Sequence, residues 1–560
     1  MSAAIPVRRP RGALLLAVVL MAAALVYGVG TRGFALSEPD EARYGEIARE
    51  MLESGDWITP RLNYVVYFEK PPLVYWSSAL AFAGLGQSEF AARLPVVLSA
   101  VLTLALTAWL ARRLYGDATA LLATGGLAVS PLFGVLAVAL TLDMALTACI
   151  TLAMVCAWHA CAWQAEADEP RSVAARTRWV RAAYVATALA MLVKGPVAAL
   201  LIGAAVFLYA VTHGGLRAVR AWLDWRAFAL AAVIALPWFV LVGLRNPGFW
   251  QFFIVDQHFT RFVSKREHGQ PIWFFLPVLP VALAPWGFVA LADPVAPRAA
   301  WDPRTWRPGT HFCAIWAAVI VVFFSLSASK LLTYVLPALP ALSILCARLV
   351  LTNVDRGHVA GVKRIGWLLL FSGLVMGLCA ALLPMFMHHW RVRALAPFLF
   401  AAALPMAVTG LLSGRLVVAG RARAALAVLG CGWALLFCIA VAGRGAANEY
   451  RSLGVAARTE LREGDRLALY QKYVQGMPFY AGRRVVLIGG RSELKFGSQQ
   501  GDHSAWFWSG DEDLIREWRS PSRLFVLFNR QDLDRLRAQL DPPPIEIAAK
   551  DKKVLVKNRP

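Results

Sequence analysis

Long apolar stretches alternate with short polar connections from about residue 13 to residue 442. The first stretch, Ala13 to Val29, is long enough to cross a bilayer. Similar stretches follow, with basic residues between them, and alternating the two sides predicts roughly thirteen membrane-spanning helices. The first stretch also fits a cleaved signal peptide. We favour an uncleaved helix, because a charged segment follows at once and needs an anchor.

The pattern changes after Gly443. Short apolar strands alternate there with charged helical stretches: Leu467–Tyr470, Val485–Ile488 and Leu524–Phe528 as strands, Asp511–Arg519 and Gln531–Leu540 as helices. The sequence therefore predicts a mainly α polytopic membrane protein with a small C-terminal α/β domain. We place the membrane domain at 1–442, with a first outer loop at about 31–78, and the soluble domain at 443–560.

Composition supports a membrane protein, since 58% of the 560 residues are hydrophobic and 16% are charged. The net charge of +22 would suggest nucleic acid in a soluble chain. Here the basic residues lie mostly in short connections, where they orient helices, so we expect no nucleic-acid partner. The eight cysteines lie in or beside apolar stretches without metal-type spacing, and we interpret them as small core residues.

The segment from Ser37 to Trp76 concentrates charges directly behind the first apolar stretch. It contains Glu38, Asp40, Glu41, Arg43, Glu69 and Lys70, together with Tyr67 and the Pro71-Pro72 pair. Ionisable groups beside a membrane need either water or each other. A solvated loop is one interpretation. Stiff prolines and interfacial aromatic residues favour a functional site instead.

Further isolated charges fall at the expected outer ends of later spans: Asp143, Lys194, Arg261 and Lys330. Taken singly, Asp143 suits a helix cap, and Lys194 or Lys330 suits a side chain that snorkels from a helix end. Together they suit an anionic lipid head group that reacts with a polar substrate. Cations would neutralise phosphate, and carboxylates would orient a nucleophile or take its proton.

Several motifs carry a family resemblance. They are Glu38-Pro-Asp-Glu-Ala-Arg-Tyr, Phe68-Glu-Lys-Pro-Pro, Glu89-Phe-Ala-Ala-Arg-Leu-Pro, Thr141-Leu-Asp, Lys194-Gly-Pro, His258-Phe-Thr-Arg-Phe, Ser329-Lys-Leu-Leu-Thr-Tyr and, more loosely, Tyr473-Val-Gln-Gly-Met-Pro-Phe-Tyr. The chain resembles membrane glycosyltransferases of the GT-C fold that use polyprenyl-phosphate sugars. It is most similar to bacterial 4-amino-4-deoxy-L-arabinose transferases that modify lipid A, which are relatives of the protein O-mannosyltransferases.

The resemblance implies roles for individual residues. Catalysis falls to Asp40 and Asp143, sugar binding to Glu69 and Glu41, and donor-phosphate binding to Arg43, Tyr67, Lys70, Arg261, Lys330 and Lys194. No cofactor is required, although Glu69, His258 and His268 form an alternative divalent-metal site. The implied donor is an undecaprenyl-phosphate-linked aminosugar and the implied acceptor is lipid A. The implied place is the bacterial inner membrane, with site and soluble domain periplasmic, and the implied result is polymyxin resistance.

Three alternatives stay open at this point. The acceptor could be a protein or another glycolipid. A transporter of lipid-linked sugars would place polar groups at mid-membrane in broken helices, whereas these charges lie at helix ends. A non-catalytic binding platform would leave the carboxylates of the first loop unexplained.

Overall fold

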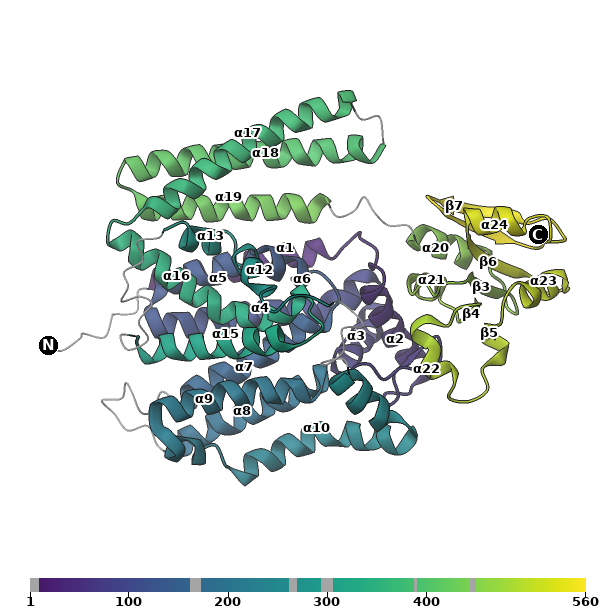
Figure 1. Ribbon diagram of the computed structural model, residues 1–560, viewed down its shortest axis with the longest axis horizontal. Helices are drawn as coiled ribbons and strands as arrows, with labels where there is room; N and C mark the ends of the chain where they lie inside the picture. Colours follow the sequence, from purple (N-terminus) through teal and green to yellow (C-terminus); the bar gives the residue numbers. More distant parts are fainter. Residues whose placement is uncertain (1–9, 162–172, 261–268, 294–305, 387–389, 444–449) are drawn as a thin grey trace. The chain divides into compact units, whose positions relative to one another are not determined.

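The computed structural model describes residues 10–161, 173–260, 269–293, 306–386, 390–443 and 450–560. The chain forms two compact units (Figure 1). The first unit comprises Met1–Gly30, Val96–Val240 and Trp250–Arg444. The second comprises Thr31–Pro95, Leu241–Phe249 and Gly445–Pro560, so the charged loop shares a unit with the C-terminal residues.

Membrane-length helices dominate the first unit. Within the described residues, ten helices are long and apolar enough to cross a membrane, and eleven if one bent pair counts as a single span. They are α1 (Pro10–Gly30), α4 (Glu89–Tyr115), α7 (Leu142–Cys161), α9 (Pro196–Arg220), α10 (Trp225–Arg245), α15 (Pro308–Leu326), α16 (Leu339–Asp355), which continues η4 (Leu332–Ala338), α17 (Ala360–Phe386), α18 (Trp390–Val418) and α19 (Ala422–Gly443). The protein is thus a multi-pass membrane protein, as the sequence predicts.

The predicted number of thirteen spans is not confirmed, and the difference lies at three places. The segment 118–138 is a pair of helices, α5 (Asp117–Ala128) and α6 (Pro131–Ala137), bent by 64°. The bend follows from Pro131, because Ser130 before it takes an extended conformation. The helix α8 (Val173–Lys194) carries three arginines in its first half. Two later apolar helices, α12 (Phe275–Ala282) and α13 (Trp286–Leu291), are each too short to span alone.

The second unit begins with a buried helix and a tight hairpin. The helix α2 (Asp40–Ser54) ends at Gly55, whose φ of 68° lets its N–H bond the carbonyl of Met51. Two short strands follow, β1 (Arg61–Leu62) and β2 (Val65–Val66). They are joined by Asn63 and Tyr64, both at positive φ, as a two-residue hairpin turn requires. The apolar helix α3 (Leu73–Leu85) completes this part.

A six-stranded sheet in the order β5-β4-β3-β6-β8-β7 forms the core of the C-terminal part. The parallel strands are β5 (Phe507–Trp508), β4 (Val485–Ile488), β3 (Arg466–Tyr470) and β6 (Leu524–Asn529); β8 (Lys553–Lys557) and β7 (Ile545–Lys550) add an antiparallel edge. Its helices are α20 (Tyr450–Glu460), α21 (Gly476–Ala481), α22 (Lys495–Ser498), α23 (Asp511–Arg519) and α24 (Arg530–Leu536), with the short 3-10 turns η6 (Ser492–Leu494) and η7 (Ser504–Trp506).

This part confirms the predicted small α/β domain. The strands β3, β4 and β6 lie within one residue of the predicted ranges, and α23 matches its range. The helix predicted to reach Leu540 ends instead at Leu536. One apolar cluster holds the domain together, since Leu514 and Trp518 of α23 pack with sheet residues such as Val526.

Candidate active site

The N-terminal end of α2 presents an exposed carboxylate beside a half-buried guanidinium. Asp40 opens the helix after Pro39, where a negative charge complements the helix dipole. Its side chain is 56% exposed, and its Oδ1 accepts a hydrogen bond from Arg43 at 3.0 Å. This short-range pair leaves the other carboxylate oxygen of Asp40 available to a substrate, so the predicted catalytic residue is accessible.

Arg43 forms ion pairs with two carboxylates, those of Asp40 and Glu493. Its second guanidinium nitrogen lies 2.5 Å from Oε2 of Glu493, which also accepts a hydrogen bond from the side chain of Gln475. Glu493 and Gln475 come from the C-terminal domain, and sequence reasoning did not single out Glu493. The Nε of Arg43 is buried and has no hydrogen-bond partner among the described residues. Arg43 is therefore held in place with one donor still to satisfy, as expected for a group that meets an anion.

Tyr67 supplies a second buried donor near this cation. Its hydroxyl has no hydrogen-bond partner among the described residues. Burial, and then the nearby Glu69 carboxylate, raises the pKa of Tyr67 well above its usual range. The phenol therefore stays protonated and can donate a hydrogen bond to a ligand oxygen. The hydroxyl of Tyr75 is likewise buried and unpaired among those residues, and its ring lies 5.9 Å from that of Tyr44.

Glu69 and Lys70 connect the hairpin to α3. The Nζ of Lys70 donates to the backbone carbonyl of Glu69 at 3.0 Å, and both side chains are half-buried. Glu69 acts electrostatically on Arg43 and Tyr67, and Arg43 pairs with Asp40, so these four residues form one cluster. The structure thus brings together Asp40, Arg43, Tyr67, Glu69 and Lys70 within the second unit, from separate parts of the loop.

The carboxylates of two other acidic residues in the loop already accept hydrogen bonds from other parts of the protein. Glu41 is buried, and both of its oxygens accept hydrogen bonds from Arg93, at 2.7 and 2.8 Å. Glu38 accepts the backbone N–H groups of Gln475 and Gly476, at 3.1 and 2.6 Å. Burial raises the pKa of Glu38 to about 7, although these N–H groups work in the opposite direction. The geometry of Glu41 gives no support to the predicted sugar contact.

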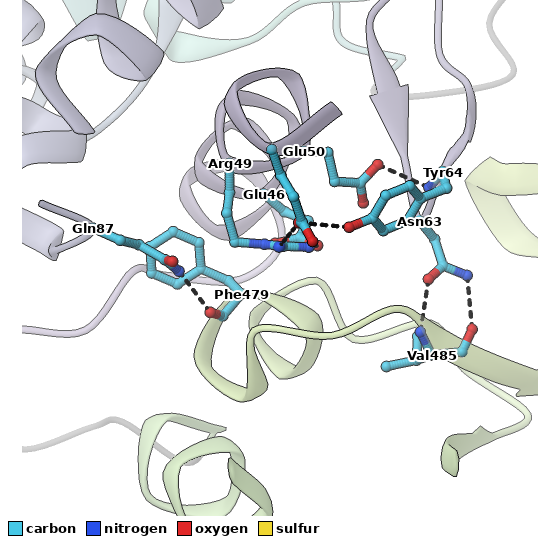
Figure 2. A network of polar contacts seen from close by, with 9 residues as sticks. Glu46, Arg49, Glu50, Asn63, Tyr64, Gln87, Phe479 and Val485 are labelled. Atoms are coloured by element: carbon cyan, nitrogen blue, oxygen red, sulfur yellow. Dashed lines mark hydrogen bonds and ion pairs between the residues drawn. The ribbon is translucent and has the colours of Figure 1, made fainter. Parts of the chain in front are cut away.

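The C-terminal end of α2 carries a second, more deeply buried network (Figure 2). Arg49 makes two hydrogen bonds to Glu46, at 2.7 and 2.8 Å, and also pairs with Glu53. Glu50 accepts the backbone N–H of Tyr64 at 2.8 Å. Glu46 and Glu50 are both fully buried. Burial, and then Glu46, raises the pKa of Glu50 well above its usual range, which favours the protonated form of Glu50.

Asn63 joins the hairpin to the sheet of the C-terminal domain. Its amide nitrogen donates to the carbonyl of Val485, and its amide oxygen accepts the N–H of Val485, both at 2.9 Å (Figure 2). The residue is fully buried and sits in the left-handed turn conformation that asparagine tolerates. Within the second unit, the loop that carries Asp40 is therefore fixed to β4.

The first unit places Asp143 and Lys194 at the ends of helices and Lys330 in the connection between α15 and η4. Lys194, at the end of α8, forms an ion pair with Asp143 in the first turn of α7. Its Nζ also lies 4.9 Å from the centre of the Tyr334 ring. Lys330 is 5% exposed and donates to the backbone carbonyls of Gln270, at 2.9 Å, and Ser327, at 2.5 Å. A carboxylate and a cation are therefore paired in this unit as well, at Asp143 and Lys194.

The predicted metal ligands are only partly described. His268 lies outside the described residues, and so does the side chain of His258, although the backbone of His258 belongs to η2 (Gln251–Thr260). Arg261, predicted to bind the donor phosphate, lies outside them as well. Among the residues that the structure describes, no three His, Cys, Asp or Glu side chains are grouped so that they could hold a metal ion. The alternative metal site around Glu69 stays an untested prediction.

Comparisons with known proteins cover nearly the whole chain. Residues 13–253 match the family model of dolichyl-phosphate-mannose-protein mannosyltransferases, and residues 453–558 match the aminoarabinose transferase C-terminal domain. The undecaprenyl phosphate-alpha-4-amino-4-deoxy-L-arabinose arabinosyl transferase of Pseudomonas aeruginosa (strain LESB58) is 31% identical over 520 residues, which are 88% of this chain and 90% of the relative. The transferase of the same name from Pectobacterium atrosepticum is 33% identical over 370 residues, or 65% of this chain and 64% of its own.

Solved structures agree with these relatives. The crystal structure of ArnT from Cupriavidus metallidurans bound to undecaprenyl phosphate superposes with a TM-score of 0.84 at 27% identity, covering 97% of this chain and 98% of that one. The archaeal oligosaccharyltransferase AglB from Archaeoglobus fulgidus shares the fold, with a TM-score of 0.54 at 14% identity over 94% of this chain and 70% of its own. The predicted GT-C fold is thereby confirmed, and the chain belongs to the family of undecaprenyl phosphate-alpha-4-amino-4-deoxy-L-arabinose arabinosyl transferases.

Proposed function

We propose that this glycosyltransferase moves 4-amino-4-deoxy-L-arabinose from undecaprenyl phosphate to phosphate groups of lipid A. Membership of the family supports the donor, since the relatives are named for it and the Cupriavidus structure contains undecaprenyl phosphate. The observation on this chain that carries the proposal is the accessible Asp40 carboxylate beside Arg43, whose buried Nε lacks a partner among the described residues. That pairing fits an anionic donor whose sugar must be oriented for attack.

The reaction exchanges one phosphate glycoside for another. An oxygen of the acceptor phosphate attacks the anomeric carbon, the bond from that carbon to the donor phosphate breaks, and undecaprenyl phosphate leaves with the bonding electrons. The attacking phosphate is already anionic near neutral pH, so it needs little help from a base. Asp40 positions the acceptor or the sugar, and placement together with charge neutralisation supplies most of the rate.

The cations of the site serve the donor phosphate. Arg43, Lys70 and the Tyr67 hydroxyl hold phosphate oxygens and stabilise the additional negative charge on the leaving group. The family resemblance makes Lys330, Lys194 and Arg261 further candidates for binding a donor phosphate, and Asp143 orients Lys194 through their ion pair. Glu69 binds the amine of the sugar, where a carboxylate is the natural partner.

The experiment that tests this function is mass spectrometry of lipid A from cells with and without the protein. We expect a mass increase of one aminopentose per modified phosphate in the cells that contain it, and lower susceptibility to polymyxin, because the added amine masks negative charge. The purified protein should modify lipid A and leave peptides unmodified. Transfer to peptides with no transfer to lipid A would favour the protein-acceptor alternative.

We propose further that the protein lies in the bacterial inner membrane, with the loop at Ser37–Trp76 and the residues after Gly443 on the periplasmic side. The basic connections between spans support this orientation. Cysteines introduced at the exposed positions Ser54 and Ser504, in a variant without the eight native cysteines, should both react with a membrane-impermeant thiol reagent once the outer membrane is permeabilised. Labelling of only one position would contradict this topology.

The reaction as proposed requires no metal ion. Activity should persist after incubation with EDTA, and added magnesium or calcium should not raise it. A complete loss with EDTA that a divalent ion restores would instead support the alternative site built around Glu69.

A further inference from the structure

A polar cavity lies at the carboxyl ends of three parallel strands in the C-terminal domain. Its volume is about 940 Å³. It is lined by residues at or just after the ends of β3, β4 and β5, by the first two residues of α23 and by one residue of α24. None of these lining residues belongs to the first loop, where Asp40 and Arg43 lie. The volume falls within the range of about 300–1,000 Å³ that is usual for small-molecule sites.

The position in the sheet is one that favours ligand binding. The chain runs outward from β3 to β4 and β5, and then returns through α23 to β6 on the other side of β3. The order of the strands therefore reverses between β3 and β6, and a crevice opens outside the carboxyl ends at such a switch point. Residues from both directions line the cavity, since Gln471 follows β3 and Arg535 belongs to the helix after β6.

The backbone at this edge is shaped to leave room. Gln471 adopts a φ of 61° and Gly489 a φ of 89°, both in the left-handed region. The Gly489 N–H bonds the carbonyl of Trp508, and the Gln471 N–H bonds that of Ile488. The two turns therefore have their own hydrogen bonds satisfied, and the strained conformation of Gln471 matches what is commonly found at ligand sites.

Three side chains form a continuous polar row along the cavity. The Tyr470 hydroxyl donates to Oδ1 of Asp511 and accepts from Arg535, both at 2.5 Å. Arg535 also donates to Oδ2 of Asp511 at 2.9 Å. Its guanidinium is half exposed, so donors remain available beside the carboxylate. Hydrogen-bond acceptors and donors of the protein thus alternate along the cavity. This arrangement suits neighbouring hydroxyl groups of a ligand, because each hydroxyl both donates and accepts.

The charge of the lining selects among ligands. Asp511 and Glu512 oppose the single cation Arg535, which leaves the cavity with a net negative charge. Asp513, in the same first turn of α23, already binds Ser509 and Arg516. The hydrogen bond from Tyr470 lowers the pKa of Asp511, so this carboxylate is ionised at neutral pH. An anionic ligand would meet repulsion here, and a neutral or cationic one would not.

We propose that this cavity is a saccharide-binding site that takes a neutral or amino-substituted sugar through Asp511, Tyr470 and Arg535. The carboxylate and guanidinium grip adjacent hydroxyls of the ring, and Glu512 faces an amine where the sugar carries one. The site requires no bond to form or break. It does not depend on the transfer reaction proposed above, because its residues are separate from those assigned to catalysis.

The test is saturation-transfer NMR with the full-length protein in lipid nanodiscs. The probes are methyl α-D-glucopyranoside, D-glucosamine and glucose 1-phosphate. We expect transfer to the first two sugars and much weaker transfer to the phosphorylated one. No transfer to either of the first two, or stronger binding of glucose 1-phosphate, would overturn the proposal.

Variants locate the signal within the protein. Arg535→Met and Tyr470→Phe should each weaken binding about tenfold, as expected for losing one hydrogen bond to a charged group. Arg530→Met is the matched control, because Arg530 lies on the same helix with a similarly exposed side chain, paired with Glu546. Thermal melting of each variant checks folding, and Arg535→Lys provides a milder variant that keeps the charge and loses the fork. A signal of equal strength in the parent, Arg535→Met and Arg535→Lys would place the sugar elsewhere and overturn the assignment.

Discussion

The two ends of helix α2 use the same residue types for different purposes. At the N-terminal end, Asp40 is 56% exposed and Arg43 keeps a buried nitrogen without a partner in the described part of the chain. At the C-terminal end, Glu46 is fully buried and Arg49 is shared between it and Glu53. The charges at the N-terminal end are therefore available to a ligand. The charges at the C-terminal end pair with each other and stabilise the loop. Residue type alone does not distinguish them; burial and pairing do.

The largest expected effect is on catalysis at the N-terminal end. Asp40→Asn should lower the rate of sugar transfer by roughly 100-fold or more, because the reacting groups lose the carboxylate that positions them. Its melting temperature should stay close to that of the parent, because the carboxylate is mostly exposed. Transfer is measured by mass spectrometry of lipid A after reaction with purified protein.

Glu53→Gln provides the matched control for Asp40→Asn. Glu53 lies on the same helix, is 53% exposed and also pairs with an arginine three or four residues away. We expect nearly full activity from it. Equal losses in the two variants would remove the distinction between the ends of α2, and normal transfer by Asp40→Asn would exclude Asp40 from the reaction.

The next effect is on stability at the C-terminal end. Arg49→Met leaves the buried Glu46 carboxylate without its cation, which should cost about 3–5 kcal/mol of folding free energy. Melting in detergent, followed by tryptophan fluorescence, measures the loss. Arg61→Met is the comparison, since its ion pair with Asp56 is 3.6 Å long and a third exposed, and we expect it to cost less than about 1 kcal/mol. Similar melting temperatures for both variants would show that the buried network does not hold the loop.

Lys70 tests whether the cations near Asp40 act on the donor. Lys70→Met removes one charged hydrogen bond to the donor phosphate, worth about 1.5–3 kcal/mol, so transfer should slow by roughly ten- to a hundredfold. Binding of undecaprenyl phosphate, followed by native mass spectrometry, should weaken in parallel. Lys472→Met, at an exposed position of the C-terminal domain, should leave both unchanged. Undiminished binding by Lys70→Met would make this lysine an ordinary helix-end cation.

The sequence predicted the membrane spans and the α/β domain because hydrophobic periodicity is local. It also singled out Asp40, Arg43 and Lys70 as site candidates, since several charges directly behind a membrane segment are unusual. It gave a span count that the structure does not confirm, because the short helices α12 and α13 carry the same apolar signal as a full span. The sequence could not separate Glu41, which Arg93 neutralises, from Asp40 next to it.

Contacts between distant segments account for the remaining misses. Glu493 forms an ion pair with Arg43, which lies 450 positions earlier in the chain. Nothing in the sequence around either residue indicates the other as its partner. The motif beginning at Tyr473 was noticed only as a resemblance, although Gln475 and Gly476 bind Glu38 through their backbone N–H groups. Such long-range hydrogen bonds follow from the fold and have no periodic signature.

Glu493 should show a smaller, indirect effect. Glu493→Gln keeps the shape of the side chain and loses the charge that holds Arg43, so Arg43 should populate other positions. We expect transfer to slow by about tenfold, as for one weakened charged hydrogen bond, mainly through a higher KM for the donor. Glu463→Gln, at an exposed site of the same domain, is the control. A fall in kcat with an unchanged KM would indicate that Glu493 acts on the reacting atoms instead.

The smallest effect distinguishes the two buried carboxyl groups at the C-terminal end of α2. Because the pKa of Glu50 is raised by burial, the folded protein keeps this proton while the unfolded chain releases it above about pH 4.5. The unfolded chain then binds fewer protons than the folded one, so the contribution of Glu50 to stability is greatest below that pH and declines as the pH rises. Glu50→Gln replaces a neutral acid with a neutral amide, and its stability relative to the parent should therefore increase with pH. Glu46→Gln should destabilise at neutral pH instead, since it removes the anion that Arg49 neutralises. The measurement is the melting temperature of the three proteins between pH 4.5 and 8. If the difference in melting temperature between the parent and Glu50→Gln stays constant over that range, Glu50 is ionised in the folded protein. Both carboxylates would then share Arg49.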